Sequence, residues 1–279
     1  MYPTIEVRPV RPVAPYLGGK RNLAGRLCKM IDAIPCQTYV EPFVGMGGIF
    51  LRRSRRPAAE VINDLSGDVA NLFLVLQEHY PFLMDILRWR LTSRVEFERL
   101  LALPADRLTD LHRAARFLYL QRLAFGGKIE GRAFGVSPAT PGRFDISKLE
   151  PMLAELHERL SGVVIERLPY DQIILRYDAP GTLFYLDPPY WGCESDYGPD
   201  SFSRAEFGRM AELLTSVEGR FILSLNDTPE VRATFAAFSI DEIETTWSIS
   251  SPTPAGATRV TELVISGGRA PLPATNLLL

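Results

Sequence analysis

The residues with the clearest capacity for chemistry are Asp187, Pro188, Pro189 and Tyr190, which close the apolar run TLFYLD. The Asp187 carboxylate and the Pro188 carbonyl can accept hydrogen bonds from an exocyclic amine and hold it in line with a methyl sulfonium. Proline lacks an N–H and stiffens the turn, so the carbonyl is presented with little conformational freedom. Tyr190 offers a flat face on which an unstacked base can lie. The alternative is a Pro-Pro turn that merely ends a strand, and the tyrosine disfavours it.

A second chemical motif is the glycine-rich turn Glu41–Gly48 (EPFVGMGG), in which Gly45 and Gly47 let the backbone approach a ligand closely. It completes neither Gly-x-Gly-x-x-Gly nor a P-loop, which argues against a pyrophosphate site. Asp64 follows about twenty residues later, where an acid can accept hydrogen bonds from ribose hydroxyls. A ribose-binding acid without a pyrophosphate fingerprint predicts S-adenosylmethionine as the cofactor rather than NAD.

Seven short apolar runs are the expected strands that position these loops. They are Tyr39–Phe43, Glu60–Asp64, Val163–Leu168, Thr182–Asp187, Arg220–Leu225, Ser239–Trp247 and Arg259–Ile265. Helical stretches between most of them, such as Gly19–Ile34 and Arg204–Ser216, indicate an α/β fold. Only a Pro/Gly-rich turn separates the last two runs, which allows antiparallel pairing but no parallel crossover. We therefore expect a mostly parallel seven-stranded sheet with one reversed strand at its end.

Parallel topology has a consequence for the two loops. Ligand crevices in open α/β sheets lie beyond the carboxyl ends of the strands. The Gly45 turn and the Asp187 loop are therefore expected to share one site.

About a hundred residues separate the second and third expected strands, too many for one crossover helix. We expect a helical subdomain over residues 72–160, inserted into a catalytic domain over 10–71 and 161–268, with 1–9 and 269–279 as flexible termini. From residue 88 to 148 there are twelve Lys/Arg against six Asp/Glu, whereas the whole chain has a formal net charge of −2. A basic insert suits DNA binding. A solvated helical surface can produce the same count by chance.

The overall composition indicates the class of protein and its cellular compartment. Hydrophobic residues at 46% and charged residues at 23% are ordinary for a globular protein. Cys28, Cys36 and Cys193 form no metal-spaced pair and suit a reducing cytoplasm. We expect a cytoplasmic protein with no signal peptide, no membrane span, no bound metal and no obligate protein partner.

With these motifs in place, the chain resembles the Dam-type (alpha group, class D12) DNA adenine-N6 methyltransferases from about Tyr16 to Ser266. The matching segments in chain order are Tyr16–Lys20 (YLGGK), Glu41–Gly47, Asp64, Phe117–Arg122, Tyr170-Asp171, Asp187–Tyr190, Leu223–Asp227, Ser248–Ser251 and Thr261–Leu263. The resemblance implies a Rossmann-like methyltransferase fold and S-adenosylmethionine as cofactor. The cofactor-binding residues that it implies are Tyr16, Lys20, Glu41, Phe43, Gly45, Gly47, Asp64, Asp171 and Asp187.

The resemblance is thinnest in the insert. Relatives that methylate GATC carry an aromatic-Asn-Gly turn and then a longer polar hairpin with an Arg. Here the stretch Phe125–Arg132 is shorter and lacks the Asn. By resemblance, Phe125 wedges into the base stack, and Lys128 or Arg132 reads guanine in the major groove. Arg122 belongs to the helix that leads into this DNA-binding loop. The implied partner is double-stranded DNA, and the recognition sequence stays open.

The implied activity is methyl transfer to N6 of adenine in duplex DNA, with the base flipped out of the stack. A cytosine-N4 methyltransferase shares the architecture, but Asp rather than Ser before Pro-Pro favours adenine. A glutamine-directed protein methyltransferase usually has Asn at this position. A non-catalytic DNA-binding relative would need neither Lys20, Asp64 nor Asp187. A nicotinamide oxidoreductase would need the full glycine fingerprint, which is missing.

Overall fold

Seven strands form the main sheet of the computed structural model, which describes residues 2–135, 139, 141–194, 198, 202–247 and 258–269. In chain order these strands are β2 Thr38–Glu41, β4 Ala59–Asn63, β5 Val164–Glu166, β6 Thr182–Leu186, β7 Arg220–Asn226, β8 Ser239–Trp247 and β9 Thr258–Gly268. Each of the seven runs expected from the sequence overlaps one of them. All five residues of β6 are buried, as a strand covered on both faces requires.

The strand order is β5-β4-β2-β6-β7-β9-β8, and the pairs from β5 to β7 are parallel. The α/β prediction with one reversed strand is confirmed: β9 runs antiparallel to both of its neighbours. Its position needs a correction, because β9 lies one strand in from the edge. Its apolar centre is buried between β7 and β8, while β8 carries Asp241, Glu242 and Glu244 and suits the edge.

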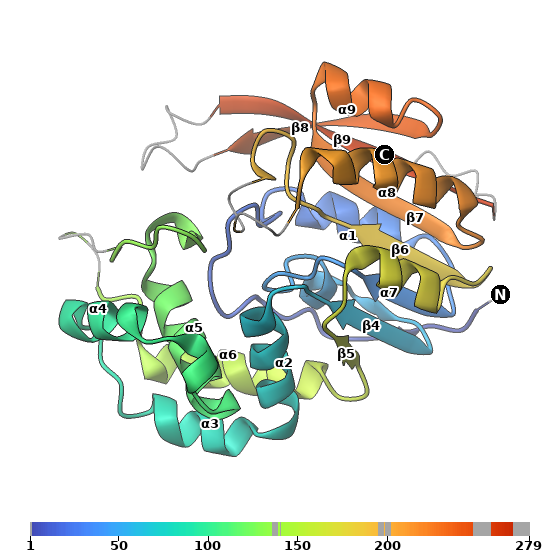
Figure 1. The fold of residues 1–279 in the computed structure, drawn as a ribbon. Helices are drawn as coiled ribbons and strands as arrows, with labels where there is room; N and C mark the ends of the chain where they lie inside the picture. The colour runs from blue at the N-terminus through green and yellow to red at the C-terminus, as the bar shows by residue number, and fades with distance from the viewer. Residues whose placement is uncertain are drawn as a thin grey trace.

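Helices cover both faces of the sheet (Figure 1). The helices in chain order are α1 Ala24–Asp32, α2 Gly67–Glu78, α3 Tyr80–Leu87, α4 Arg94–Ala102, α5 Asp110–Leu123, α6 Ile146–Arg159, α7 Tyr170–Tyr177, α8 Arg204–Ser216 and α9 Pro229–Thr234, with 3-10 turns η1 Phe50–Arg52, η2 Ala105–Arg107 and η3 Phe125–Gly127.

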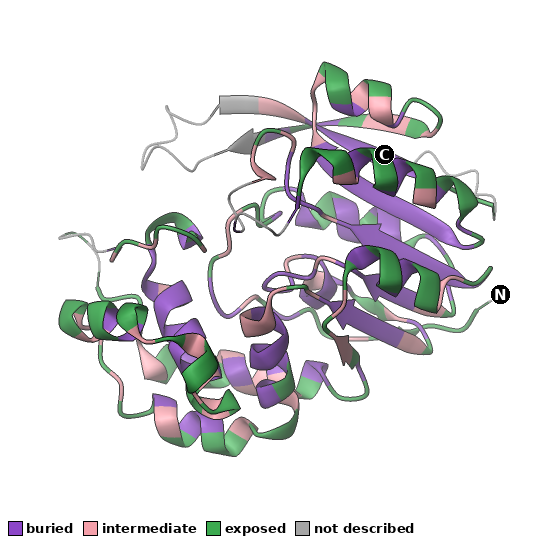
Figure 2. Ribbon diagram, in the orientation of Figure 1, coloured by how far each residue is buried: buried purple, intermediate pink, exposed green. Residues whose placement is uncertain are grey.

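Alternate side chains of the central strands enter two separate clusters of the core. Val40 and Phe184 join the cluster that packs against α7, α8 and α9. Their chain neighbours Tyr39 and Leu183 join the other cluster, which includes α1 and the helices of the insert. The central strands β2, β4, β6 and β7 are accordingly buried along almost their whole length (Figure 2). This two-sided packing fixes the strands whose ends carry the site.

Five helices, α2 to α6, fill the chain between β4 and β5 and form the expected helical insert (Figure 1). Helix α5 packs against α2, α3 and α4. It is buried almost throughout from Ala114 to Leu123. Helix α2 begins at Gly67, so the expected boundary between residues 71 and 72 falls inside a helix. The division into domains otherwise stays a prediction.

Much of the positive charge of the insert is used internally. Arg90 and Arg99 both pair with Glu96. Arg116 is buried and donates to the carbonyl oxygens of Leu100 and Leu101. Counting basic residues in the sequence therefore overstates the positive charge that this insert presents at its surface.

The N-terminal residues are more ordered than expected. Ile5–Glu6 (β1) pairs antiparallel with Arg55–Arg56 (β3), and Val10 and Val13 are buried. The sequence of residues 1–9 lacks a strand-length apolar run, so only pairing with a distant segment reveals β1. Residues 270–279 and Ser248–Ser251 lie outside the described residues. In the part of the chain that is described, no helix is long and apolar enough to cross a membrane.

Candidate active site

One cavity of about 1440 Å³ gathers most of the predicted cofactor-binding residues beyond the carboxyl ends of β2, β4 and β6. Its wall includes the predicted residues Tyr16, Lys20, Glu41, Phe43, Gly45, Asp64, Arg122, Arg132, Asp171, Asp187 and Pro189. The expected meeting of the glycine turn and the Asp187 loop is thus observed. Gly47, Pro188, Tyr190, Phe125 and Lys128 are not part of this wall.

The glycine turn depends on backbone conformations that side chains rarely adopt. Gly45 has φ +50° and Gly47 has φ +74°. A Cβ atom at Gly45 would lie 2.9 Å from the Tyr16 ring, and one at Gly47 would lie 2.8 Å from Leu51. Gly45 therefore lets Tyr16 pack against the turn at the cavity wall, whereas Gly47 serves packing beneath it.

Asp64 closes the turn from the neighbouring strand. One carboxylate oxygen accepts from the Gly45 N–H at 2.9 Å and the other from the Ser66 N–H at 2.9 Å. Burial raises the pKa of Asp64 to about 6, and the two backbone donors oppose that rise. Each carboxylate oxygen keeps a second lone pair, so Asp64 can still accept hydrogen bonds from a diol.

Asn63, which the sequence reasoning missed, ties three segments together at this edge. Its amide nitrogen donates to the Pro42 and Leu168 carbonyl oxygens, both at 2.9 Å, and its oxygen accepts from the Leu168 N–H at 2.8 Å. The bonds join the end of β4 to the glycine turn and to the loop before α7. A polar residue ending an apolar strand (EVIND) was the available signal.

Four side chains meet in a buried cluster beside the cavity: Lys20, Asp187, Tyr190 and Glu262. The Lys20 ammonium lies 2.7 Å from Asp187 Oδ1 and 2.9 Å from Glu262 Oε1, and it also donates to the Tyr190 hydroxyl. Tyr190 in turn donates to Glu262 Oε2 at 2.6 Å. Lys20 is only 4% exposed, although a lysine near a helix start usually lies on the surface. The cluster joins the Gly-Gly-Lys loop, the catalytic candidate and β9.

Asp187 lines the cavity together with Lys20, whereas Tyr190 and Glu262 do not. Burial raises its pKa to about 6, against the opposing effect of the Lys20 ammonium. Its Oδ1 also accepts from the Ser224 hydroxyl at 3.4 Å, and Ser224 is hydrogen-bonded to Tyr185 at 2.9 Å. The carboxylate is therefore held by β7 as well as by Lys20.

Tyr190 lies differently from the expectation of an open stacking surface. Its side chain is buried, with a relative exposure of 8%, and the Lys20 ammonium sits 4.1 Å from its ring centroid. The next residue, Trp191, exchanges two 3.0 Å hydrogen bonds with the Asn226 side chain through its backbone N–H and carbonyl. Asn226 thus fixes the far end of the Asp-Pro-Pro-Tyr loop, a role that the sequence reasoning did not assign.

An aromatic wall lines the other side of the cavity. Phe43 stacks on Tyr170 with ring centroids 5.5 Å apart, and Phe202 packs edge-on against Phe43 at 6.1 Å. Asp171 lies exposed in the first turn of α7 and also lines the cavity. Flat apolar rings next to an acid suit an aromatic heterocycle with exocyclic donors. Phe202 was missed because it stands in no recognised motif.

Glu41 is a third acid with a raised pKa at the cavity. It is 2% exposed and accepts from the Tyr39 hydroxyl at 2.8 Å. Burial raises its pKa to about 8. Several buried carboxyls with raised pKa values around one cavity are typical of a functional site.

The predicted DNA-reading residues are placed unequally. Phe125 is 57% exposed and Lys128 is exposed, so both are accessible at the tip of the loop after α5. Arg132 donates to Gln121 and lies at the cavity wall. Arg122 donates to the carbonyl oxygens of Val13 and Arg143, which uses its guanidinium to tether backbone. In this conformation Arg122 positions the loop rather than presenting a free cation.

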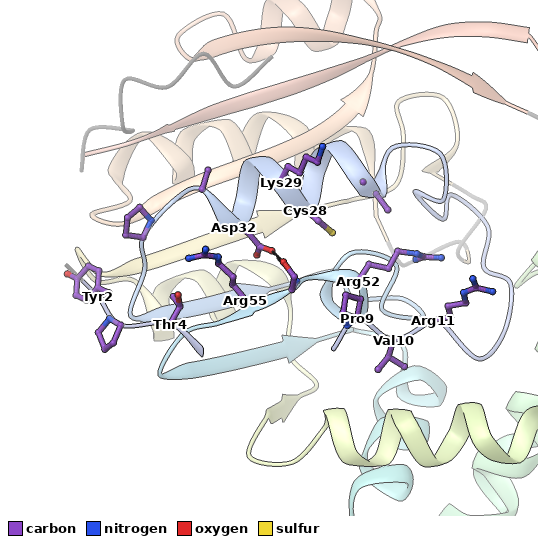
Figure 3. Close-up of a pocket in the computed structure, with 16 residues that line it drawn as sticks. Tyr2, Thr4, Pro9, Val10, Arg11, Cys28, Lys29, Asp32, Arg52 and Arg55 are labelled. Carbon is purple, nitrogen blue, oxygen red and sulfur yellow. Dashed lines mark hydrogen bonds between the residues drawn. The ribbon is translucent and has the colours of Figure 1, made fainter. Parts of the chain in front are cut away.

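A second hollow, of about 1200 Å³, lies between α1 and the N-terminal segment (Figure 3). Its titratable lining offers little chemistry. Burial raises the pKa of Cys28 to about 12, so the thiol is neutral. The Asp32 carboxylate is occupied by Arg53 and Ser54. We therefore assign the chemistry to the first cavity. Among the described residues no group of His, Cys, Asp and Glu is arranged to hold a metal ion.

Comparison with known proteins agrees with this geometry. Residues 16–249 match the sequence model of the D12 class N6 adenine-specific DNA methyltransferase family. The type II methyltransferase M.CviBI of Paramecium bursaria Chlorella virus NC1A is 22% identical over 239 residues, covering 84% of this chain and 90% of that protein. The DNA adenine methylase of Salmonella typhi is 24% identical over 260 residues, covering 85% and 88%.

Among solved structures, a precorrin 8W decarboxylase of Methanobacterium thermoautotrophicum aligns over 94% of this chain and 100% of its own. The TM-score is 0.40 and the identity 12%, a distant likeness. The matches in sequence, by contrast, span the cavity residues from Tyr16 through Asp187.

Proposed function

This chain belongs to the D12 class N6 adenine-specific DNA methyltransferase family, and from that premise we propose that it transfers a methyl group from S-adenosylmethionine to N6 of adenine in duplex DNA. The observation that carries the proposal is the shared cavity of Asp187 and the Gly45–Asp64 turn. For direct methyl transfer, the Asp187 loop that holds the acceptor and the ribose-binding Asp64 must be close enough for one cofactor molecule to reach both. A common cavity meets that requirement.

Different predicted cofactor-binding residues would contact different parts of the cofactor. We assign the ribose to Asp64, the adenine ring to Asp171 and the aromatic wall of Phe43, and the methionine end to the region of Tyr16 and Lys20. When bound, S-adenosylmethionine supplies an electrophilic methyl group. No metal is required for this transfer.

The residues of the Asp187 loop would act on the acceptor. The Asp187 carboxylate and the Pro188 carbonyl accept hydrogen bonds from the N6 amine and direct its lone pair at the methyl carbon. Transfer would form the bond between N6 and the methyl carbon as the bond from that carbon to sulfur breaks, and the N6 proton would then pass to solvent. Catalysis of this kind depends on position and on electrostatic preorganisation. We infer that Tyr190 acts mainly by holding Lys20 and Glu262, since its ring is buried.

DNA binding would use the insert and the loop that follows α5. An adenine amine cannot be reached inside a stacked duplex, so the base must swing out into the cavity. The exposed Phe125 is suited to fill the vacated stack, and Lys128 is suited to read a base edge in the major groove. The recognition sequence follows from this loop and not from the catalytic residues.

The direct test is to identify the modified base. DNA from cells that express the protein is digested to nucleosides and analysed by mass spectrometry, and the same DNA is sequenced for the positions of modification. We expect N6-methyladenine within one short sequence context. Detection of N4-methylcytosine would instead assign the alternative activity, cytosine-N4 methylation. If the DNA carries no modified base although the expressed protein is folded, a non-catalytic DNA-binding relative would be favoured.

Replacing Asp64 with asparagine should weaken the binding of S-adenosylmethionine. The Asp64 carboxylate has two acceptor oxygens, and each already accepts a hydrogen bond from a backbone N–H. Asparagine keeps only one acceptor oxygen. We expect the Kd for S-adenosylmethionine to rise about 10- to 100-fold, as for loss of a charged hydrogen-bond partner. Isothermal calorimetry measures this Kd, and DNA affinity without cofactor should not change. Asp85→Asn, on the exposed surface of α3, is the control, and an equal loss in both variants would contradict the assignment.

A further inference from the structure

The buried cluster beside the cavity does not balance its charges. The Lys20 ammonium lies within 2.9 Å of two carboxylates, those of Asp187 and Glu262. Among the described residues no other cation lies within salt-bridge distance of either acid. One positive charge between two ionised carboxylates leaves a net charge of −1. Lys20 and Glu262 have side chains only 2% exposed, so water screens this charge poorly.

Glu262 is the residue that creates the imbalance. Lys20 and Asp187 alone would form a neutral pair. Glu262 adds the second carboxylate from β9, and Tyr190 orients it by donating to Oε2 at 2.6 Å. Burying a carboxylate in the middle of a strand is costly unless it is paired and hydrogen-bonded, and Lys20 and Tyr190 supply these partners to Glu262. Glu262 does not line the cavity itself, but it lies 2.9 Å from the Lys20 ammonium, and Lys20 and its other partner Asp187 both line the cavity.

The two small molecules of the proposed reaction differ in charge. S-adenosylmethionine carries a positive sulfonium, and its product S-adenosylhomocysteine is a neutral thioether at the same atom. We propose that the Lys20–Asp187–Glu262 cluster is a charge filter that favours the cationic methyl donor over the neutral product, with Glu262 as the residue that sets the preference. The inference rests on the proposed function. It would help the product leave once the methyl group has been transferred.

The other groups around Asp187 are consistent with this role. Glu41 approaches the same cavity, and burial raises its pKa to about 8, so it is mostly protonated at neutral pH. Burial raises the pKa of Tyr185 well above its ordinary value, so this phenol is neutral. A cation in the cavity would favour the ionised form of each nearby carboxyl. The net negative charge is therefore greatest when the donor is bound.

The test compares two ligands in one variant. In Glu262→Gln the side chain keeps its shape and loses its charge. We expect the preference, Kd of S-adenosylhomocysteine divided by Kd of S-adenosylmethionine, to fall about tenfold, while the Kd of S-adenosylhomocysteine stays within about twofold. Calorimetry on the full chain measures both. Glu244→Gln, a charge loss at an exposed position of β8, should leave the preference unchanged.

Equal weakening of both ligands by Glu262→Gln would assign a merely structural role and overturn the inference, as would an unchanged preference. If that variant does not fold, the wild-type protein decides. Its preference for the donor should shrink between pH 7 and pH 5, where Glu41 stays mostly protonated, because protonation of Asp187, whose pKa is about 6, removes negative charge from the cluster. Asp64 also has a pKa of about 6, but the ribose assigned to it is common to both ligands, so its protonation should not change the preference. A preference independent of pH would overturn the inference. Failure of the wild type to bind either ligand would instead overturn the proposed function.

Discussion

Replacement of Asp187 by alanine should abolish methyl transfer while leaving the fold and DNA binding largely intact. The carboxylate is the group best placed to accept from the target amine, and loss of one preorganised electrostatic partner typically costs about 10²- to 10³-fold in rate. Asp187 also holds the loop through Lys20 and Ser224, so misplacement adds to this loss. We expect activity below detection in Asp187→Ala and a small residual rate in Asp187→Asn, which keeps one acceptor oxygen.

The measurement is single-turnover transfer of a labelled methyl group to duplex DNA at saturating cofactor. The fold should survive because Lys20 retains Glu262 as a buried partner when Asp187 is removed. Thermal unfolding and DNA affinity measured by anisotropy provide the control readouts. Turnover by Asp187→Ala at more than a few per cent of the wild-type rate would remove this residue from the mechanism. Loss of DNA binding in step with activity would point to a structural defect instead.

Of the substitutions proposed for this protein, replacement of Lys20 by methionine should produce the largest loss of stability. It leaves the carboxylates of Asp187 and Glu262 side by side without a cation, and removing one partner of a buried ion pair typically costs about 3–5 kcal/mol. Chemical denaturation at pH 8 measures the free energy of unfolding. Lys29→Met is the matched control, because Lys29 is exposed on α1 and should change this free energy by less than about 0.5 kcal/mol.

The Lys20 variant should also change how stability depends on pH. In the wild type the folded pKa of Asp187, about 6, lies above its ordinary value of 3.8, so its ionisation costs stability above pH 6 and that cost disappears as the pH falls below 4. Without Lys20 the folded pKa rises further. The stability deficit of Lys20→Met should therefore shrink as the pH is lowered from 8 to 5. A deficit that is constant over this range would show that Lys20 acts by packing alone.

The sequence was sufficient to predict the strands and the loops that carry the chemistry. Buried parallel strands appear as short continuous apolar runs, and glycine and proline mark the turns at their ends, so both signals are local. From parallel topology alone it followed that the Gly45 turn and the Asp187 loop share one edge of the sheet. The position of β9 between β7 and β8 did not follow, because the hairpin pattern is the same whichever strand lies outside.

Only the tertiary structure decided what the charged residues do. By resemblance Lys20 is a cofactor-binding residue and Arg122 a DNA-binding one. In the fold Lys20 is buried between Asp187 and Glu262, and Arg122 tethers the carbonyl oxygens of Val13 and Arg143. The partner of a charged side chain depends on which distant segments of the chain pack together. Local sequence propensities do not encode that packing. The sequence by itself therefore determined the kind of chemistry and the loops that hold it. The fold determined the electrostatics under which those loops act.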